Sequence, residues 1–394
     1  MEASGLDKDL EKMFALNSER MEKMAVSGAV IDMSDPIRDL SLALHPPCLK
    51  LMISDVRQEI KGVRSYRLIS SRRETGLPYF RAGQYLSLKA QINNKVVSRP
   101  YSISSAPYLS KNFYELTIAY KEGGFVSEYI WDSWQPGFEI IATGPHGNCY
   151  YDPLRDQPDL IALAGGSGIA PIRSLINEMI KTGKPRRMIC LYGSRDEKNI
   201  IFQAELAELA RQHPEQFTLI HVLSEPTASW QGYRGFITAE VLQKAIDDPL
   251  NYSYFICGPP EMSTFCLNSL AKLGIPRRSI RSEPTATADI PLTDNDQPQD
   301  NRNIFYAIQY TRREKTGMIK ALAAETILTA LERAGLNPDA QCRSGECGFC
   351  RALLLSGSVL IRKDGDGRRA ADLEYGYIHT CSTYPLSDLQ LIIN

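Results

Sequence analysis

Four of the nine cysteines in this chain are spaced as ligands of an iron–sulfur cluster. Cys342, Cys347 and Cys350 follow the pattern C-x4-C-x2-C, and Cys381 comes after thirty further residues. Three thiolates on one tight loop, with a fourth from a distant segment, form a known ligand set for a 2Fe–2S cluster. Such a centre carries one electron at a time, so the rest of the chain must supply the electrons.

The cluster loop also contains Gly345 and Gly348. Glycines let a loop wrap closely, so that backbone N–H groups can point at the sulfurs and stabilise their negative charge. A zinc site is the alternative, but zinc sites usually show two C-x2-C pairs, or cysteines with histidines at short spacing. Here there is one such pair, and the nearby histidine is His379. The spacing therefore favours the 2Fe–2S cluster.

Composition limits the classes of protein to which the chain belongs. Its 394 residues are 43% hydrophobic, which suffices for two or three domains with cores of their own. With 45 basic and 46 acidic residues, bulk nucleic-acid binding is not expected. There is no apolar run of about twenty residues, so no membrane span is predicted.

The remaining cysteines and the first residues indicate a cytoplasmic protein. The chain begins with acidic residues and lacks the basic-then-apolar layout of a signal peptide. The cysteines outside the cluster motif are scattered, mostly in apolar contexts, and are interpreted as reduced thiols. They are Cys48, Cys149, Cys190, Cys257 and Cys266.

Periodicity divides the chain into segments of different type. Short strands separated by turn residues predict an antiparallel β-barrel, whereas apolar strands alternating with helices predict a doubly wound α/β domain. A polar, aperiodic stretch predicts a linker, and the cluster part contains one clear helix at 325–334. The predicted boundaries are a helical, amphipathic extension at 1–46, the barrel at 47–153, the α/β domain at 154–283, the linker at 284–303 and the cluster domain at 304–394.

A glycine-rich turn follows the predicted strand 160–164. Gly165, Gly166 and Gly168 precede a predicted helix, and Pro171 suits its first turn, where no N–H is needed. Glycines at such a turn let a dinucleotide approach the backbone, and the helix N-terminus favours its pyrophosphate. The pattern is not G-x-G-x-x-G, so by itself it is weak evidence for a nucleotide site.

Several motifs together resemble the ferredoxin–NADP reductase family. They are the Gly-Gly-x-Gly-x-x-Pro turn, the segment Cys257-Gly258-Pro259-Pro260, and Arg99-Pro100-Tyr101-Ser102 in the barrel. The resemblance covers about residues 50–283, and the cluster part resembles plant-type ferredoxins, with an α+β, β-grasp-like fold. It implies a multidomain chain in which Arg99 pairs with a flavin phosphate, Tyr101 stacks on the flavin, and Ser102 lies near flavin N5.

The resemblance also implies which flavin is bound. In the family, a Gly-Gly-x-x-Ser segment at a helix start holds the flavin pyrophosphate. This chain has Gly123, Gly124, Val126 and Ser127 at that place. Because FMN has only one phosphate, FAD is favoured. FMN stays open as an alternative, since some relatives with a C-terminal ferredoxin domain use it.

For the nicotinamide nucleotide, the resemblance leaves the choice between NADH and NADPH open. Ser194 and Arg195 follow the second α/β strand and could grip a 2′-phosphate, whereas Asp196 could accept from a free 2′-hydroxyl. The family also implies that Cys257 faces the nicotinamide beside the flavin and that Glu283 is the acidic residue near it. The aromatic residue that usually follows is replaced by Thr285.

Together these features predict an NAD(P)H-dependent iron–sulfur flavoprotein reductase. Ser102, Cys257 and Glu283 are the candidate catalytic residues. Electrons would pass from the nicotinamide through FAD and the cluster to a one-electron acceptor protein, such as the terminal oxygenase of a multicomponent system. The alternatives are transfer in the reverse direction, an anaerobic redox partner, or a redox sensor. The sequence does not identify the acceptor, the oligomeric state or the role of residues 1–46.

Overall fold

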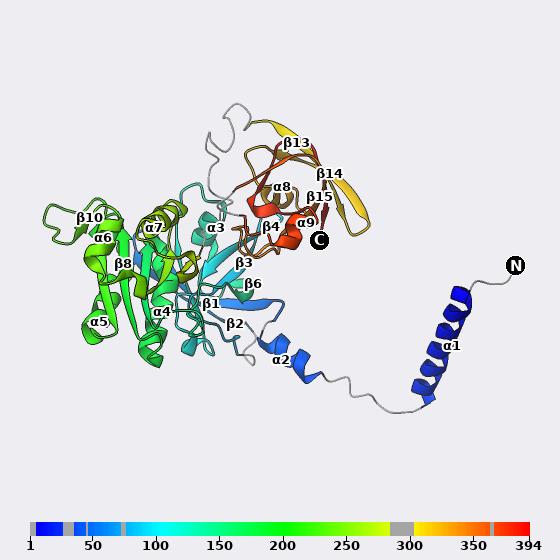
Figure 1. Cartoon of the computed structure of the whole chain (residues 1–394), viewed down its shortest axis with the longest axis horizontal. Coiled ribbons are helices and arrows are strands. Elements are labelled where there is room, and N and C mark those ends of the chain that lie inside the picture. Colours follow the sequence, from blue (N-terminus) through cyan, green and yellow to red (C-terminus); the bar gives the residue numbers. More distant parts are fainter. Residues whose placement is uncertain (1–4, 27–34, 45, 72–75, 284–302, 363–365) are drawn as a thin grey trace. The chain divides into compact units, whose positions relative to one another are not determined.

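Figure 1 shows the computed structural model of the whole chain, which describes all residues except 1–4, 27–34, 45, 72–75, 284–302 and 363–365. The predicted linker at 284–303 therefore lies outside the described residues, apart from its last position. By its internal contacts the chain divides into two units, Met1–Ala43 and Leu44–Asn394.

The first unit contains helix α1 (Gly5–Val26) and most of helix α2 (Pro36–Leu44). Asp35 caps α2, because its Oδ1 accepts from the N–H groups of Ile37 and Arg38 at 3.1 and 3.0 Å. Large apolar side chains of both helices are exposed. These include Met13, Leu16, Met21, Ile37 and Leu40.

The second unit begins with an antiparallel six-stranded sheet in the order β4-β3-β6-β1-β2-β5. An isolated bridge between Ile103 and Leu116 joins the end of β4 to β5, so the sheet closes into a barrel. At the β3–β4 hairpin, Asn93 and Asn94 both have positive φ, as a tight two-residue turn requires. The elements are β1 (Leu49–Ile60), β2 (Val63–Ser70), β3 (Tyr85–Ile92), β4 (Lys95–Ser102), η1 (Pro107–Leu109), β5 (Tyr114–Ala119), α3 (Phe125–Ser133) and β6 (Glu139–His146).

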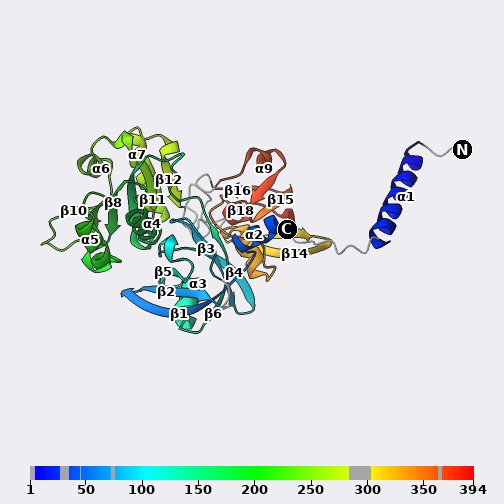
Figure 2. The same cartoon turned by 90° about the horizontal axis from the view of Figure 1, so that it is seen from below.

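A parallel six-stranded sheet follows, in the order β10-β9-β8-β7-β11-β12. Helices α4 and α5 cover one face and α6 and α7 the other (Figures 1 and 2). The elements are β7 (Asp159–Gly165), η2 (Gly166–Gly168), α4 (Ile169–Thr182), β8 (Arg187–Ser194), η3 (Glu197–Asn199), α5 (Gln203–Gln212), β9 (Phe217–Leu223), β10 (Tyr233–Arg234), α6 (Ala239–Ala245), η4 (Pro249–Asn251), β11 (Ser253–Cys257), α7 (Pro260–Lys272), η5 (Arg277–Ser279) and β12 (Ile280–Glu283).

The strand order of this sheet reverses beside β7, because β8 pairs with one edge of β7 and β11 with the other. In doubly wound folds, ligands bind outside the carboxyl ends of the strands at this point. The predicted α/β architecture is therefore confirmed, and the fold itself places a ligand site near the glycine-rich turn.

The C-terminal part is a mixed five-stranded sheet in the order β14-β13-β19-β15-β17, with a small β16-β18 pair. Helix α8 packs on this sheet through Ile327, Ala330 and Leu331, giving the predicted α+β fold. The elements are β13 (Phe305–Arg312), β14 (Lys315–Leu322), α8 (Ile327–Arg333), β15 (Arg351–Ser356), β16 (Val359–Ile361), α9 (Ala370–Glu374), β17 (Tyr377–His379), η9 (Thr380–Ser382), β18 (Thr383–Pro385) and β19 (Leu389–Ile393).

The helix predicted at 325–334 begins at Ile327, because the Thr326 hydroxyl accepts from Thr329 N–H at 3.2 Å and caps it.

Among the described residues, we find no helix with the length and apolar character needed to cross a bilayer.

Candidate functional site

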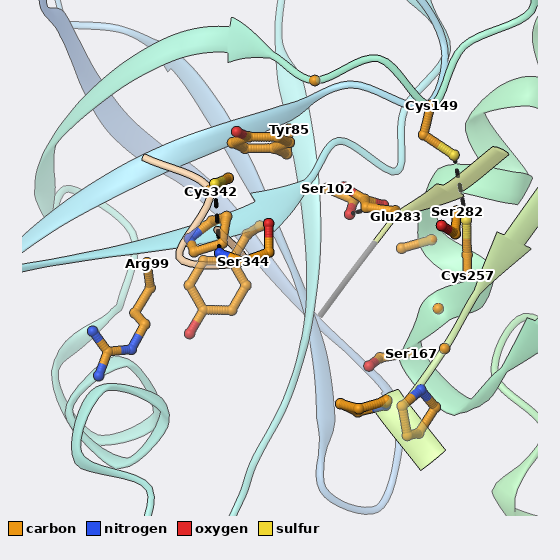
Figure 3. Close-up of a pocket in the computed structure, with 18 of the residues that line it drawn as sticks. Tyr85, Arg99, Ser102, Cys149, Ser167, Cys257, Ser282, Glu283, Cys342 and Ser344 are labelled. Atoms are coloured by element: carbon orange, nitrogen blue, oxygen red, sulfur yellow. Dashed lines mark hydrogen bonds between the residues drawn. The ribbon is translucent and has the colours of Figure 1, made fainter. Parts of the chain in front are cut away.

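A cavity of about 1460 Å³ lies where the three parts of the second unit meet. Its walls come from the barrel, the turn after β7, the carboxyl ends of β11 and β12, and the cluster loop. Its lining residues include Tyr101. Arg99, Ser102, Cys257, Glu283 and Cys342 also line it and are labelled in Figure 3. The predicted flavin, nicotinamide and cluster segments therefore share one cavity, which is large enough for cofactors of dinucleotide size.

The flavin motif lies on β4, the edge strand of the barrel sheet. Pro100 is tolerated there, because an edge strand has one row of backbone groups outside the ladder. Arg99 lines the cavity, with 16% of its side chain exposed. Its Nη1 donates to Ser98 O at 2.9 Å and lies 3.9 Å from Glu332 Oε2. A guanidinium at this wall suits the phosphate of a flavin.

The start of helix α3 forms another part of the wall. Gly123 has φ +71°, and a Cβ on Gly124 would meet Ser127 Oγ at 2.3 Å, so this turn requires glycine. No side chain caps the helix at Gly124. Gly123, Gly124, Val126 and Ser127 all line the cavity. Backbone N–H groups at an uncapped helix start fit a pyrophosphate and hence FAD, and the guanidinium of Arg99 lines the same cavity.

The glycines of the turn after β7 are also required by packing. A Cβ on Gly168 would lie 2.1 Å from Cys257 O, and a Cβ on Gly165 would lie 2.1 Å from Met262 Sδ. Protein atoms of the β11–α7 turn therefore occupy the space that these glycines leave. Gly168 lines the cavity, whereas Gly165, Gly166 and Pro171 are not among its lining residues.

The residues predicted to read the adenosine ribose lie at the end of β8, outside the lining of this cavity. Asp196 Oδ1 accepts from Lys198 N, Asn199 N and Asn199 Nδ2, which caps η3. The Asn199 side chain and these backbone donors hold the pKa of Asp196 below its usual range. The carboxylate is thus engaged within its own loop, while Arg195 is exposed.

Ser102 and Glu283 meet in the cavity although they are 181 positions apart (Figure 3). Ser102 Oγ donates to Glu283 Oε2 at 2.9 Å. Burial raises the pKa of Glu283 to about 7, against the lowering effect of this hydrogen bond. A carboxyl group with such a pKa is present in both protonation states near neutral pH, so it can exchange a proton with a bound ligand.

Cys257 ends β11, and its neighbour in the adjacent strand is Glu283. Its Sγ lies 3.9 Å from Sγ of Cys149. The contact with Cys149 and burial both raise the pKa of Cys257 well above its ordinary value, so the thiol stays protonated. The sequence marks Cys149 only as one of several scattered thiols, and no local pattern connects it with this site.

The four motif cysteines lie close together, and Cys342 and Cys347 line the cavity. Cys342 interacts with both Cys347 and Cys381, and Cys381 also interacts with Cys350. Cys342, Cys350 and Cys381 are buried, and Cys347 is half-buried. Thr380 ties the fourth ligand segment to the loop, because its Oγ1 donates to Cys350 O at 2.9 Å.

Backbone donors surround these sulfurs, as the loop glycines predict. Gly345 and Gly348 both have positive φ. Cys342 Sγ accepts from Ser344 N and Cys347 N at 3.5 and 3.3 Å, and Cys381 Sγ accepts from Gly345 N at 3.2 Å. N–H groups aimed at thiolates fit an anionic iron–sulfur cluster. The described residues contain no compact group of three or more His, Cys, Asp or Glu side chains suited to one metal ion. The assignment therefore rests on the spacing, the pairwise contacts and the N–H donors.

Three parts of the chain match known domain families. Residues 50–151 match the oxidoreductase FAD-binding domain, residues 162–268 the oxidoreductase NAD-binding domain, and residues 313–386 the 2Fe-2S iron-sulfur cluster binding domain. The predicted cofactors FAD, a nicotinamide nucleotide and a 2Fe–2S cluster are thereby confirmed, and the zinc alternative is set aside.

Similar proteins cover nearly the whole chain. The glycine betaine monooxygenase reductase subunit of Pseudomonas aeruginosa is 26% identical over 365 residues, which cover 87% of this chain and 93% of that protein. The ferredoxin reductase component of 3-ketosteroid-9-alpha-monooxygenase from Mycobacterium tuberculosis is 28% identical over 375 residues, covering 90% and 98%.

Among solved structures, phthalate dioxygenase reductase has the same fold. It superposes with a TM-score of 0.63 at 21% identity, covering 92% of this chain and all of that one. The chain therefore combines an FAD-binding, an NAD-binding and a C-terminal 2Fe–2S domain, and over most of its length it is similar to the reductase components of oxygenase systems.

Proposed function

We propose that this protein is an NAD(P)H-dependent reductase that delivers electrons to a one-electron acceptor protein, with a terminal oxygenase as the acceptor. The observation that carries the proposal is the single cavity lined by flavin, nicotinamide and cluster segments. The names of the two relatives, both components of monooxygenase systems, support an oxygenase as the acceptor. We also propose that the protein is cytoplasmic, as the scattered cysteines outside the cluster motif indicate.

When bound, FAD and the cluster supply the redox chemistry, converting a two-electron donor into a source of single electrons. The protein holds and orients them. Arg99 and the start of α3 would hold the flavin phosphates, and Ser102 and Glu283 would lie beside the reactive part of the flavin. Cys257, a protonated thiol, would face the nicotinamide. The four cysteines would ligate the iron, and the N–H groups of the loop would stabilise the charge on sulfur.

An anaerobic titration of the purified protein with NADH, and separately with NADPH, tests this function. Visible absorption is expected to show bleaching of both flavin and cluster bands, with about three electrons taken up per chain, two on flavin and one on the cluster. The nucleotide that produces this bleaching is the physiological donor. Bleaching of the flavin alone would contradict the proposed path through the cluster.

The acceptor is tested by crosslinking in the host cell. The reduced reductase is expected to be trapped with an oxygenase component, and purified oxygenase should reoxidise it. Capture of a different redox protein that turns over with the reductase would replace the oxygenase assignment and leave the reductase function intact.

Glu283 gives a prediction of pH dependence. Its neighbours in the cavity are Ser102, Cys257, Tyr85 and Glu346. The nicotinamide donor transfers a hydride, so negative charge develops on the flavin during its reduction. Ionised Glu283 opposes that charge, and flavin reduction is therefore expected to slow as pH rises through about 7. Once Glu283 is fully ionised, the rate should level off at a lower value, because the charge slows the step without being required for it. Stopped-flow reduction from pH 6 to 9 measures this.

The Glu283→Gln variant is the control, and its profile is expected to be flat across the same range. Stability gives a second readout. Because the folded pKa is raised, the stabilisation is fully present below the unfolded pKa and is lost as pH rises through about 7. The melting temperature of the wild type should therefore fall more between pH 5 and 8 than that of the variant. Equal profiles would show that Glu283 does not titrate in this range.

A further inference from the structure

The cluster-bearing domain contacts the flavin barrel along its edge strand, β4. Ser98 Oγ donates to Ala340 O at 3.2 Å, and Ser87 Oγ of β3 donates to Gln341 O at 3.5 Å. All four residues are buried. Because Ala340 and Gln341 directly precede Cys342, these contacts fix the start of the cluster loop against the strand that carries the flavin motif.

One carboxylate lies at the centre of this contact. Glu332, near the C-terminal end of α8, is 4% exposed. Its Oε1 accepts from Arg343 Nη1 at 2.7 Å and from Ser98 N at 3.5 Å, and its Oε2 lies 3.9 Å from Arg99 Nη1. A carboxylate removed from water is costly unless it is paired and hydrogen-bonded. Here the partners come from both domains. The Glu332 carboxylate pairs with Arg343 of the cluster loop and also contacts β4, the strand that carries the flavin motif.

The partner on the cluster side is equally constrained. Arg343 follows the ligand Cys342 and is among the largest fully buried side chains of the described residues. Its φ of +54° lies in the left-handed region, which costs free energy for a residue with a Cβ. Such a conformation persists only where the surroundings hold it. The ion pair with Glu332 is a contact that holds it, so Glu332 shapes the backbone beside the cluster ligand.

We propose that Glu332 is a positioning residue, which joins the cluster loop to the flavin-binding strand and so sets the separation across which electrons move. The inference rests on the proposed function. Glu332 does not line the cofactor cavity, so it acts through Arg343 on the loop and through Ser98 and Arg99 on the strand. Small displacements of reacting groups reduce rates strongly. Loosening this contact should therefore slow transfer to the cluster, whereas flavin reduction occurs at the Ser102–Glu283 side.

The test compares Glu332→Gln with wild type in the holoprotein, carrying both flavin and cluster. Anaerobic stopped-flow with the nicotinamide donor resolves flavin bleaching from cluster bleaching. We expect the cluster step to slow by about tenfold or more, with flavin reduction within about twofold of wild type. The matched control is Glu325→Gln. Glu325 also pairs with an arginine, Arg333 at the end of α8, but has no contact with the barrel among its hydrogen bonds and ion pairs.

A second readout does not depend on turnover. The Ser98 N–H donates to Glu332, so its amide hydrogen exchange in the holoprotein should accelerate in Glu332→Gln and stay unchanged in Glu325→Gln. If Glu332→Gln fails to assemble its cluster, Ser98→Asp decides the question. That change places a carboxylate opposite Glu332 from the barrel side and leaves the cluster domain unaltered. It should slow the cluster step in the same way, provided that its flavin content is intact.

The outcomes distinguish the positioning role of Glu332 from the proposed reductase function. Wild-type cluster reduction and wild-type Ser98 exchange in a fully loaded Glu332→Gln protein would overturn the positioning role. Failure of the wild type itself to reduce its cluster would instead contradict the proposed function.

Discussion

Replacing Arg99 by alanine is expected to release most of the flavin and with it to reduce donor-dependent electron transfer strongly. Arg99 lies in the cavity wall on β4, and its guanidinium is a cation suited to pair with a flavin phosphate. Charge-assisted hydrogen bonds contribute about 1.5–3 kcal/mol, which corresponds to about a 10- to 100-fold loss of flavin affinity. Flavin per chain after gel filtration, and the Kd of the flavin-free protein, measure this loss.

Two further variants test whether the loss of flavin is specific to the guanidinium of Arg99. Arg99→Lys keeps the charge but loses the planar fork, so an intermediate affinity is expected. Arg57→Ala removes an arginine of the same barrel that pairs with Glu59 at 2.7 Å outside the cavity, and it should retain flavin. Cluster content should be unchanged in all three, because Glu332 keeps its ion pair with Arg343. Stoichiometric flavin in Arg99→Ala would show that another group holds the phosphate.

The fold could be predicted from the sequence because its signals are local. Alternating strands with turn residues identify the barrel, and uniformly apolar strands between helices identify the parallel sheet. The four cluster ligands could also be predicted, since three of them share one loop and spacing alone determines their geometry. Each of these inferences needs only residues that are close together in the chain.

The rest of the site depends on contacts between distant segments, which leave no local pattern. Ser102 meets Glu283 across 181 positions, and Cys149 meets Cys257 across 108. Burial then gives Glu283 its pKa of about 7, a property of the assembled cavity and not of the motif. The contact of Glu332 with Ser98 spans 234 positions and is invisible in either domain alone.

Even in a correctly identified motif, a residue can be needed for packing or capping as well as for binding a ligand. The turn at Gly165 and Gly168 requires glycine because the β11–α7 turn packs against it, so the same residues would be needed without any nucleotide. Asp196 shows the same ambiguity in another form. Its spacing to Asn199 is that of a capping residue, and in the structure its carboxylate caps η3. For such residues the sequence predicts a place in the fold more reliably than a ligand contact.

Replacing Cys350 by serine is expected to separate the two halves of the electron path. Cys350 is buried beside Cys381, and a serine oxygen would fill much the same space without supplying a thiolate for iron. The cluster should be lost or strongly depleted, as measured by iron and sulfide content and by the EPR signal of the reduced protein. Flavin reduction by the nicotinamide donor should persist at the wild-type rate, because Ser102, Cys257 and Glu283 lie on other domains. Anaerobic titration should then show about two electrons taken up per chain in place of about three.

The control for Cys350→Ser is Cys266→Ser, which alters a buried thiol of α7 in the nucleotide domain. Burial raises the pKa of Cys266 to about 12, so this thiol is neutral and is not expected to bind metal. Its substitution should leave the cluster and all three electrons in place. A Cys350→Ser protein with a full cluster would mean that a different residue completes the ligand set. Loss of flavin reduction as well would mean that the cluster domain is needed to build the flavin site. The contact of the cluster domain with β3 and β4 offers a route for that coupling, and such a result would direct attention to Glu332 and Ser98.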